Sequence, residues 1–296
     1  MNLLYISFGK MESVPLQAAF SIYSFAQQRG VETINIVTDA PGYYQHLQNL
    51  ISITQVDEKL INDWKGPHQF FWRAKIKAIE LMAKKYPGKA IVYLDTDTFL
   101  YGEINTLYAN LLQGKSIMHQ NEGLLSRVTG KTVQKMWQQV NGKTFGGIKI
   151  EPTANMWNAG VVAIPNTKEG AECENTLQLC DAMCAAGVTP RLIEQFALSV
   201  VLEKMYGLLP AAGVVAHYWS NKEEWVKKIT QFFIQQYFIN ATQTQIIEAV
   251  QNADFGKTAI EKRERNTAKR LYKLIDKLIP AKGIKYLPDD NDSIKK

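Results

Sequence analysis

The chain has 296 residues, of which 46% are hydrophobic and 21% are charged. A chain of this length and composition can bury a substantial core as one large α/β domain, with or without an appendage, which excludes a disordered protein. No run of residues reaches the roughly 18 uncharged apolar positions of a membrane-spanning helix, and no basic segment precedes the first short apolar run. We therefore expect a soluble, cytoplasmic protein.

The formal net charge of +6 is concentrated near the C-terminus. Residues 257–285 carry ten Lys or Arg and three Asp or Glu, whereas residues 1–256 hold equal numbers of basic and acidic side chains. Apolar residues recur at helical spacing in this segment, which predicts a basic amphipathic helix. Such a helix either binds an anionic membrane surface, making the protein peripheral at the inner membrane face, or packs on the main domain with its basic side in water. The segment lacks interleaved stacking aromatics, so we expect no nucleic-acid partner.

Strands and helices alternate along the chain. Apolar residues at helical spacing predict helices, and short apolar or β-branched runs closed by turn residues predict strands. In chain order we predict strand 3–8, helix 14–28, strand 33–38, helix 72–86, strand 90–94, helices 106–112 and 132–139, strand 158–164, helices 169–186 and 192–206, strand 213–217 and a largely helical stretch 225–250. The alternation is typical of an α/β domain with a parallel sheet and helices on both faces. We assign this domain to residues 1–225 and a basic helical extension to residues 226–296.

The strongest local signal is an apolar run that ends in two carboxylates, Ala90-Ile-Val-Tyr-Leu-Asp95-Thr96-Asp97. If the chain stays extended, alternation places Asp95 and Asp97 on the same side. There they can share a hard cation such as Mg²⁺ or Mn²⁺ and leave coordination positions for phosphate oxygens. Ligands of doubly wound sheets bind beyond the carboxyl ends of the strands, which is where this motif stands. The competing interpretation is a solvated turn.

Cationic side chains and a histidine accompany the acidic pair. His217 follows the last predicted strand and could complete a metal site as a neutral imidazole, while Lys222 could reach a phosphate of the same ligand. Arg73, Lys75 and Lys77 stand at the start of the helix that precedes the acidic strand. The alternatives are an ordinary histidine and a solvated basic helix face.

Amides and a further carboxylate stand at the starts of other elements. Asn158 precedes Ala159 and Gly160, whose small size lets a ligand or another backbone approach closely. Glu194 and Gln195 open an apolar helix. An acidic residue in a first helical turn also has the ordinary role of complementing the helix dipole, so Glu194 has both interpretations.

Two other features are interpreted without chemistry. Cys173, Cys180 and Cys184 share one side of a predicted helix and lack the paired spacing of zinc sites, so we interpret them as small apolar residues of a reduced protein. The run Gly142-Lys143-Thr144 looks like the end of a P-loop, but Trp137 stands where the earlier glycine is required.

Taken in order, these segments resemble the family 8 glycosyltransferases, the retaining group that includes glycogenin and bacterial lipopolysaccharide galactosyl- and glucosyltransferases. The resemblance runs from Leu3 to about Trp225 and rests on an opening β-α-β unit, a cationic helix, the Asp-x-Asp strand, Trp-Asn-Ala-Gly-Val, an acidic-Gln pair and His followed by Lys and Trp. It implies a GT-A fold, a Rossmann-like mixed sheet with helices on both faces. It also implies a metal-dependent hexosyltransferase that moves a sugar from a nucleotide sugar, expected to be a UDP-hexose, to a glycan or lipid-linked acceptor with retention.

The resemblance further implies roles for individual residues. Asp95, Asp97 and His217 would bind Mn²⁺ or Mg²⁺. Asn158, Glu194 and Gln195 would face the transferred sugar and the reaction centre as catalytic residues. The nucleotide-sugar donor would be contacted by Ser7, Phe8, Asp39, Arg73, Lys75, Thr96 and Lys222.

One departure from the family affects the expected mechanism. The family usually has Asp-Gln where this chain has Glu194-Gln195, and the longer side chain moves the carboxylate outward. Retention proceeds either by front-face attack, with Gln195 or Glu194 shielding an oxocarbenium-like centre, or through a covalent intermediate on Glu194. A nucleotidyltransferase would need a glycine-rich signature that Phe8-Gly9-Lys10 is too short to provide. The remaining alternative is a non-catalytic module of the same fold that binds a nucleotide sugar or a membrane surface.

Overall fold

The computed structural model describes residues 1–9, 11–168, 170–254 and 258–262, together with residues 271, 274, 275 and 278. Most of the predicted basic helix in 257–285 therefore lies outside the described residues. Among the helices that are described, none is both long enough and apolar enough to cross a membrane.

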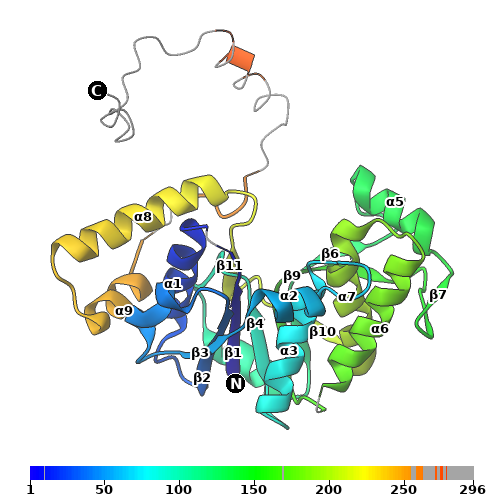
Figure 1. Cartoon of the computed structure of the whole chain (residues 1–296), viewed down its shortest axis with the longest axis horizontal. Coiled ribbons are helices and arrows are strands. Elements are labelled where there is room, and N and C mark those ends of the chain that lie inside the picture. The colour runs from blue at the N-terminus through cyan, green and yellow to red at the C-terminus, as the bar shows by residue number, and fades with distance from the viewer. Residues whose placement is uncertain are drawn as a thin grey trace, which may run out of the picture.

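A seven-stranded sheet with strand order β10-β6-β9-β4-β1-β2-β3 forms the centre of the fold (Figure 1). Its strands are β1 (Asn2–Ser7), β2 (Thr33–Thr38), β3 (Ser52–Gln55), β4 (Ile91–Leu94), β6 (Ser116–Leu124), β9 (Asn155–Ile164) and β10 (Leu208–Pro210). Strand β1 pairs in parallel with β2 and β4, while β9 runs antiparallel to both β4 and β6. The expected mixed α/β sheet is confirmed, with β9 as an antiparallel strand among parallel neighbours.

The connection between β6 and β9 explains the reversed direction of β9. It contains α5 (Lys131–Val140) and the short strands β7 (Thr144–Phe145) and β8 (Ile148–Lys149). Leu124 at the end of β6 pairs with Asn155 at the start of β9, so the connection leaves and re-enters the sheet at the same edge. If β9 were parallel to β6, the connection would instead have to cross from the carboxyl end of β6 back to the opposite end of the sheet.

Helices cover both faces of the sheet, and the strands divide their side chains between two cores. Along β1, Leu4 packs in one core and Leu3 and Tyr5 in the other, as alternation requires. The first core includes α2 (Glu58–Trp64), α3 (Arg73–Lys85), α5, α6 (Ala171–Ala185) and α7 (Ile193–Tyr206). The second includes α1 (Ser13–Phe25), α4 (Ile104–Leu112), α8 (Lys222–Phe238) and α9 (Gln243–Gln251).

Most predicted elements are present, with bounds shifted by a few residues. The helical stretch 225–250 is two helices, because Asn240 adopts a φ of 50° and the side chains of Thr242 and Gln245 form a capping box that starts α9. The prediction missed α2 and the strands β3, β5, β6, β7, β8 and β10. These elements are short or, in the case of β6, change from an apolar to a polar half, so their periodicity is weak.

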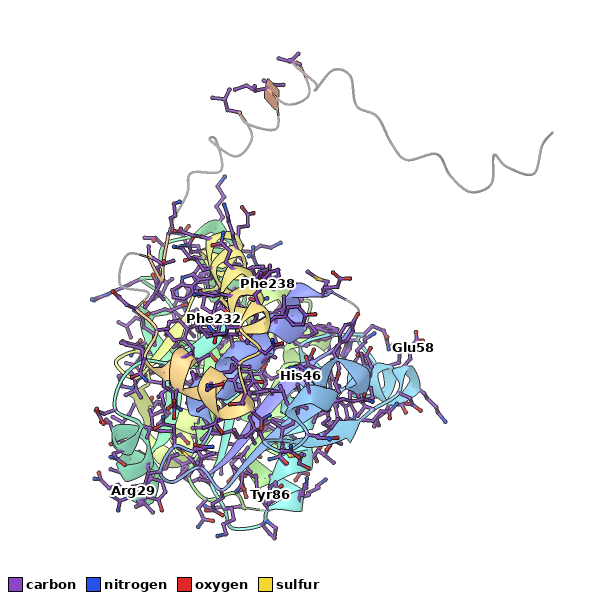
Figure 2. All side chains as sticks on the ribbon, turned by 90° about the vertical axis from the view of Figure 1, so that its left-hand side faces the viewer. Arg29, His46, Glu58, Tyr86, Phe232 and Phe238 are labelled. Carbon is purple, nitrogen blue, oxygen red and sulfur yellow. The ribbon has the colours of Figure 1, made fainter. Side chains whose placement is uncertain are left out.

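Helices α8 and α9 pack against α1 rather than forming a separate body of their own. Phe232 of α8 lies with its ring centroid 5.8 Å from that of Phe20 in α1, whereas Phe238 at the end of α8 is 76% exposed (Figure 2). The Ala259 carbonyl accepts hydrogen bonds from Trp225 Nε1 at 3.0 Å and Asn221 Nδ2 at 2.7 Å, which attaches the segment after α9 to the start of α8. The division of the chain at residue 225 stays a prediction.

Candidate functional site

The two carboxylates of the Asp-x-Asp motif follow β4 in a turn, not in an extended strand. Asp95 N donates to the Gly160 carbonyl at 2.8 Å, and Thr98 Oγ1 donates to the Asp95 carbonyl at 2.7 Å, which closes the turn before β5 (Thr98–Leu100). The sequence-based expectation that strand alternation places Asp95 and Asp97 on the same side is therefore wrong, because the chain is not extended here. The turn itself brings Asp95 and Asp97 together at the carboxyl end of β4.

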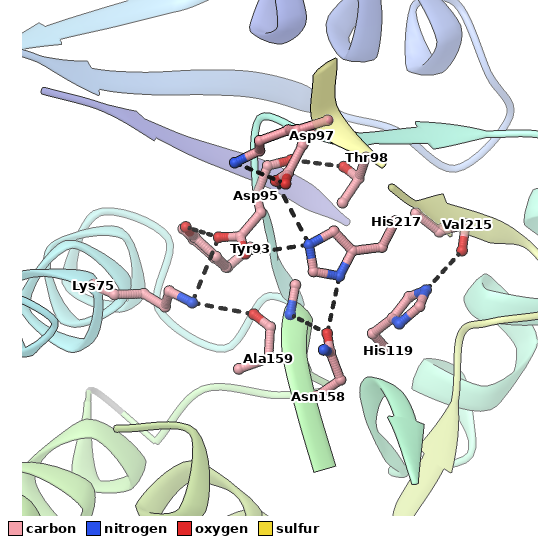
Figure 3. A network of polar contacts seen from close by, with 12 residues as sticks. Lys75, Tyr93, Asp95, Asp97, Thr98, His119, Asn158, Ala159, Val215 and His217 are labelled. Carbon is pink, nitrogen blue, oxygen red and sulfur yellow. Dashed lines mark hydrogen bonds and ion pairs between the residues drawn. The ribbon is translucent and has the colours of Figure 1, made fainter. Parts of the chain in front are cut away.

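His217 reaches the acidic pair through a second, two-stranded sheet. Strand β11 (Val215–His217) pairs antiparallel with β5 and places His217 opposite Thr98. His217 Nε2 then lies 3.5 Å from Asp97 Oδ1 and 3.7 Å from Asp95 Oδ2 (Figure 3). The fold thus assembles the three residues that the sequence singled out as metal ligands.

The imidazole of His217 lies directly against the backbone of β9 at Gly160. A Cβ atom at this position would be 2.2 Å from both Cε1 and Nδ1 of the ring. Only glycine leaves room for the ring here, so Gly160 is a structural requirement of the His217 position.

Lys222 and His217 determine the charge of Asp97. Lys222 Nζ, at the start of α8, lies 2.9 Å from Asp97 Oδ2. Burial alone would raise the pKa of the Asp97 carboxyl, but His217 in its protonated form and the Lys222 ammonium hold this pKa well below its usual range. Asp97 is therefore ionised at neutral pH, which is the state that a metal ligand needs.

A buried ion pair adjoins the acidic turn. Lys75 Nζ in α3 lies 3.0 Å from Glu194 Oε1 in α7 and 3.5 Å from Asp95 Oδ1, and it donates to the Ala159 carbonyl at 3.2 Å. Lys75 and Glu194 are only 7% and 6% exposed. Burial would lower the pKa of Lys75, yet the carboxylates of Asp95 and Glu194 raise it above its ordinary value. The Glu194 carboxylate thus points into the protein and forms an ion pair with the Lys75 ammonium, so it is not a solvated charge in the first turn of α7.

Asn158 of β9 contacts His217, and Gln195 of α7 is connected to Asn158 through Glu122. Asn158 Oδ1 lies 2.9 Å from His217 Nδ1. The exposed carboxylate of Glu122 in β6 accepts long hydrogen bonds from Asn158 Nδ2 at 3.4 Å and from Gln195 Nε2 at 3.5 Å. Glu122 was not predicted, because nothing in its local sequence marks it until β6 and β9 are known to be neighbours.

The residues expected at the nucleoside occupy the same edge of the sheet. Ser7 is buried at the end of β1 and Phe8 is half-buried just after it. Asp39 follows β2, and its two carboxylate oxygens accept from Gly9 N at 3.0 and 3.2 Å. Because β1, β2 and β4 are parallel, these groups and the half-buried Thr96 all lie at the carboxyl ends of neighbouring strands.

Arg73 is the predicted site residue that the structure does not bring into this cluster. Its guanidinium forms two bonds to the carboxylate of Asp181 in α6, at 2.9 and 3.1 Å, and donates to the Trp64 carbonyl at 2.9 Å. This bidentate pair connects α3 to α6 and α2.

Two further residues of the site were missed by sequence reasoning. Tyr93, two positions before Asp95 on β4, donates from its hydroxyl to Asp95 Oδ1 at 2.5 Å. His119 donates from Nε2 to the Val215 carbonyl at 3.1 Å, and its ring stands edge-on to that of His217 with centroids 5.1 Å apart. Strand alternation could have indicated Tyr93, whereas a lone histidine in β6 carries no signal.

The chemistry of the three candidate metal ligands fits a hard divalent cation. Asp95, Asp97 and His217 each present one ligand atom, and these atoms lie within 4.8 Å of one another. Carboxylate oxygens with an imidazole nitrogen suit Mn²⁺ or Mg²⁺, and three protein ligands leave positions for phosphate oxygens. These residues could therefore hold the metal that the motif suggested.

Comparisons with known proteins give matches among solved structures. No protein-family model and no curated protein matches the chain. Among solved structures, the apo form of mouse xyloside xylosyltransferase 1 matches with a TM-score of 0.44 and 14% identity over 71% of this chain and 85% of that chain. The WbbM bifunctional glycosyltransferase in its apo form matches with a TM-score of 0.46 and 14% identity over 71% of this chain and 39% of that chain. The galactosyltransferase LgtC in complex with donor and acceptor sugar analogs matches with a TM-score of 0.47 and 11% identity over 86% of this chain and 98% of that chain. Likenesses at these TM-scores do not establish a function.

Proposed function

We propose that the chain is a metal-dependent glycosyltransferase of the GT-A type, similar to family 8, that transfers a sugar from a nucleotide-sugar donor to a glycan or lipid-linked acceptor. The observation that supports this most is the meeting of Asp95, Asp97 and His217 beside Lys222 at the carboxyl end of β4. A divalent cation next to a lysine is an arrangement that binds a diphosphate and stabilises it as a leaving group.

The donor would extend from the ends of β1 and β2 to the metal site. Ser7, Phe8 and Asp39 would contact the nucleoside, since they stand at the same sheet edge as the acidic turn. The side chain of Lys222 is 52% exposed, so it can bind the diphosphate from the solvent side. Arg73 has no part in this proposal, because Asp181 and the Trp64 carbonyl hold its guanidinium.

Transfer breaks the bond between the anomeric carbon and the diphosphate, leaving positive charge on the sugar and negative charge on the phosphate. A bound Mn²⁺ or Mg²⁺ would supply electrostatic stabilisation of the departing diphosphate. Glu194 is buried against Lys75, while the neighbouring amide of Gln195 is half-buried beside Asn158 and Glu122. We therefore favour front-face attack with Gln195 next to the sugar over a covalent intermediate on Glu194.

Finer features of the proposal rest on the family resemblance. These are a UDP-hexose donor, retention at the anomeric carbon and a lipid-linked or glycan acceptor. A membrane-surface role for 257–285 stays a prediction, because most of that segment lies outside the described residues. Among the large apolar side chains described there, Ile260 is half-buried against the second core, whereas four are exposed: Leu271, Leu274, Ile275 and Leu278.

The test is release of the nucleotide from a panel of UDP-, GDP- and CMP-activated sugars, with and without Mn²⁺. We expect Mn²⁺-dependent release from one donor by the native chain, and its loss in Asp97→Asn. The matched control is Asp63→Asn, which removes the same charge from an exposed position on α2. Donor binding without turnover, even with acceptors added, would indicate a non-catalytic binding module. Failure to bind both Mn²⁺ and any donor would overturn the proposal.

A further inference from the structure

The orientation of the Asn158 amide follows from its neighbour Gly160. The backbone N–H of Gly160 donates to the Asn158 side chain at 3.0 Å. A backbone N–H can only donate, so the side-chain atom that it meets must be the carbonyl oxygen Oδ1 and not the amide nitrogen. The amide of Asn158 therefore has one orientation, set by a group that cannot change its role.

The same oxygen determines which nitrogen of His217 carries a proton. His217 Nδ1 lies 2.9 Å from Asn158 Oδ1. An amide oxygen has no hydrogen to offer, so the ring must donate, and Nδ1 carries the proton. In the neutral imidazole the other nitrogen, Nε2, is then a bare acceptor.

This bare nitrogen faces two carboxylate oxygens. Nε2 lies 3.5 Å from Asp97 Oδ1 and 3.7 Å from Asp95 Oδ2 (Figure 3). Three atoms with lone pairs and no proton between them repel one another unless a cation lies among them. A neutral imidazole whose second nitrogen is held by a hydrogen bond is also the form in which histidine binds metals.

The surroundings hold the His217 ring in this orientation. The backbone of Gly160 lies against one side of the ring, and His119 stands edge-on to it at 5.1 Å. Asn158 is in turn held on its far side, because its Nδ2 donates to Glu122 Oε1 at 3.4 Å.

We infer that Asn158 is a positioning residue for His217, which selects the Nδ1–H tautomer and so prepares Nε2 as a metal ligand. This differs from the catalytic role against the sugar that the family resemblance implied. The inference rests on the proposed function only for the identity of the cation as the one that binds the donor diphosphate. The tautomer itself is a property of the protein without metal or donor.

The first test is the ¹⁵N NMR spectrum of the histidine side chains in the metal-free protein at pH 8. The chain has four histidines, and His217→Gln identifies the signals of His217. We expect the Nδ1–H tautomer in the native chain and in Asn158→Asp, which keeps an acceptor oxygen, and a mixture of tautomers in Asn158→Ala. The matched control is Asn121→Ala, because Asn121 Oδ1 accepts from Gly123 N at 2.8 Å in the same local pattern on β6.

The second test is the affinity of the same proteins for Mn²⁺, measured by calorimetry without any donor. Loss of an outer-shell partner lowers metal affinity by about 10–100-fold, and we expect this loss in Asn158→Ala. Asn158→Asp and Asn121→Ala should bind Mn²⁺ at least as tightly as the native chain.

An Nε2–H tautomer in the native chain would overturn the inference, and this spectrum decides even if Asn158→Ala does not fold. An Asn158→Ala protein with native tautomer and native Mn²⁺ affinity would also overturn it. Neither readout uses a nucleotide sugar. A protein that shows the expected tautomer and Mn²⁺ affinity but binds no donor would therefore contradict the proposed function alone.

Discussion

Replacing Gly160 by alanine is the smallest change that tests the geometry of the metal site. The added methyl group would lie 2.2 Å from Cε1 and Nδ1 of His217. Non-bonded carbon atoms prefer about 3.5–4.0 Å, so the ring has to move by more than about 1 Å or the β9 backbone has to yield. Either movement separates Nδ1 from Asn158 Oδ1, which are 2.9 Å apart.

The expected effect on stability combines three contributions. Overpacking a buried site costs about 1–3 kcal/mol, and the lost hydrogen bond costs about 1 kcal/mol more. Alanine also restricts the unfolded chain, which offsets about 0.4–1 kcal/mol. We therefore expect Gly160→Ala to lower the free energy of unfolding by about 1–3 kcal/mol, together with a loss of Mn²⁺ affinity.

Gly213→Ala serves as the control, because Gly213 lies just before β11 and a Cβ atom there has no neighbour within 4 Å. Its φ is not positive, so alanine should raise the free energy of unfolding by about 0.4–1 kcal/mol, the opposite sign. Urea unfolding with a chelator measures both variants, and calorimetry with Mn²⁺ follows. If Gly160→Ala is as stable as the control and binds Mn²⁺ like the native chain, the ring is not held as described.

Three other perturbations test the surroundings of the site. Lys75→Met should lower the free energy of unfolding, measured in urea, by about 3–5 kcal/mol, because it leaves the Glu194 carboxylate buried without its positive partner. Adding Glu194→Leu should recover much of this loss. No recovery would show that the two side chains do not act as a pair. Burial lowers the pKa of His119 to about 4. As the pH falls from about 6.5 towards 4 the unfolded chain therefore takes up a proton before the folded protein does, and stability is lost across that window. This amounts to about 2 kcal/mol between pH 7 and pH 5, and His119→Gln should lose that part of the pH dependence; an unchanged dependence would contradict the assignment. Burial raises the pKa of the thiols, so iodoacetamide should label the half-buried Cys184 before the two buried cysteines, which should react only in urea; mass spectrometry of the folded protein would refute this if all three react alike.

The sequence alone was sufficient where the signal is local. Helical spacing predicted α3 and an apolar run predicted β4. The position of Asp95 and Asp97 after that run predicted a candidate cation site at the carboxyl end of β4, where these two residues and His217 meet. The order of the motifs further singled out His217 and Lys222. The predictions of α3 and β4 succeed because helical and strand periodicity depend only on a dozen neighbouring residues.

The tertiary structure decided everything that depends on which distant segments become neighbours. The pairing of β11 with β5 brings His217 to the acidic turn, and the antiparallel β9 brings Asn158 beside it. The packing of α3, α6 and α7 in one core likewise pairs Lys75 with Glu194 and Arg73 with Asp181. Strand register and helix packing are set by the total burial of both partners, and no local pattern in either segment records the identity of the other.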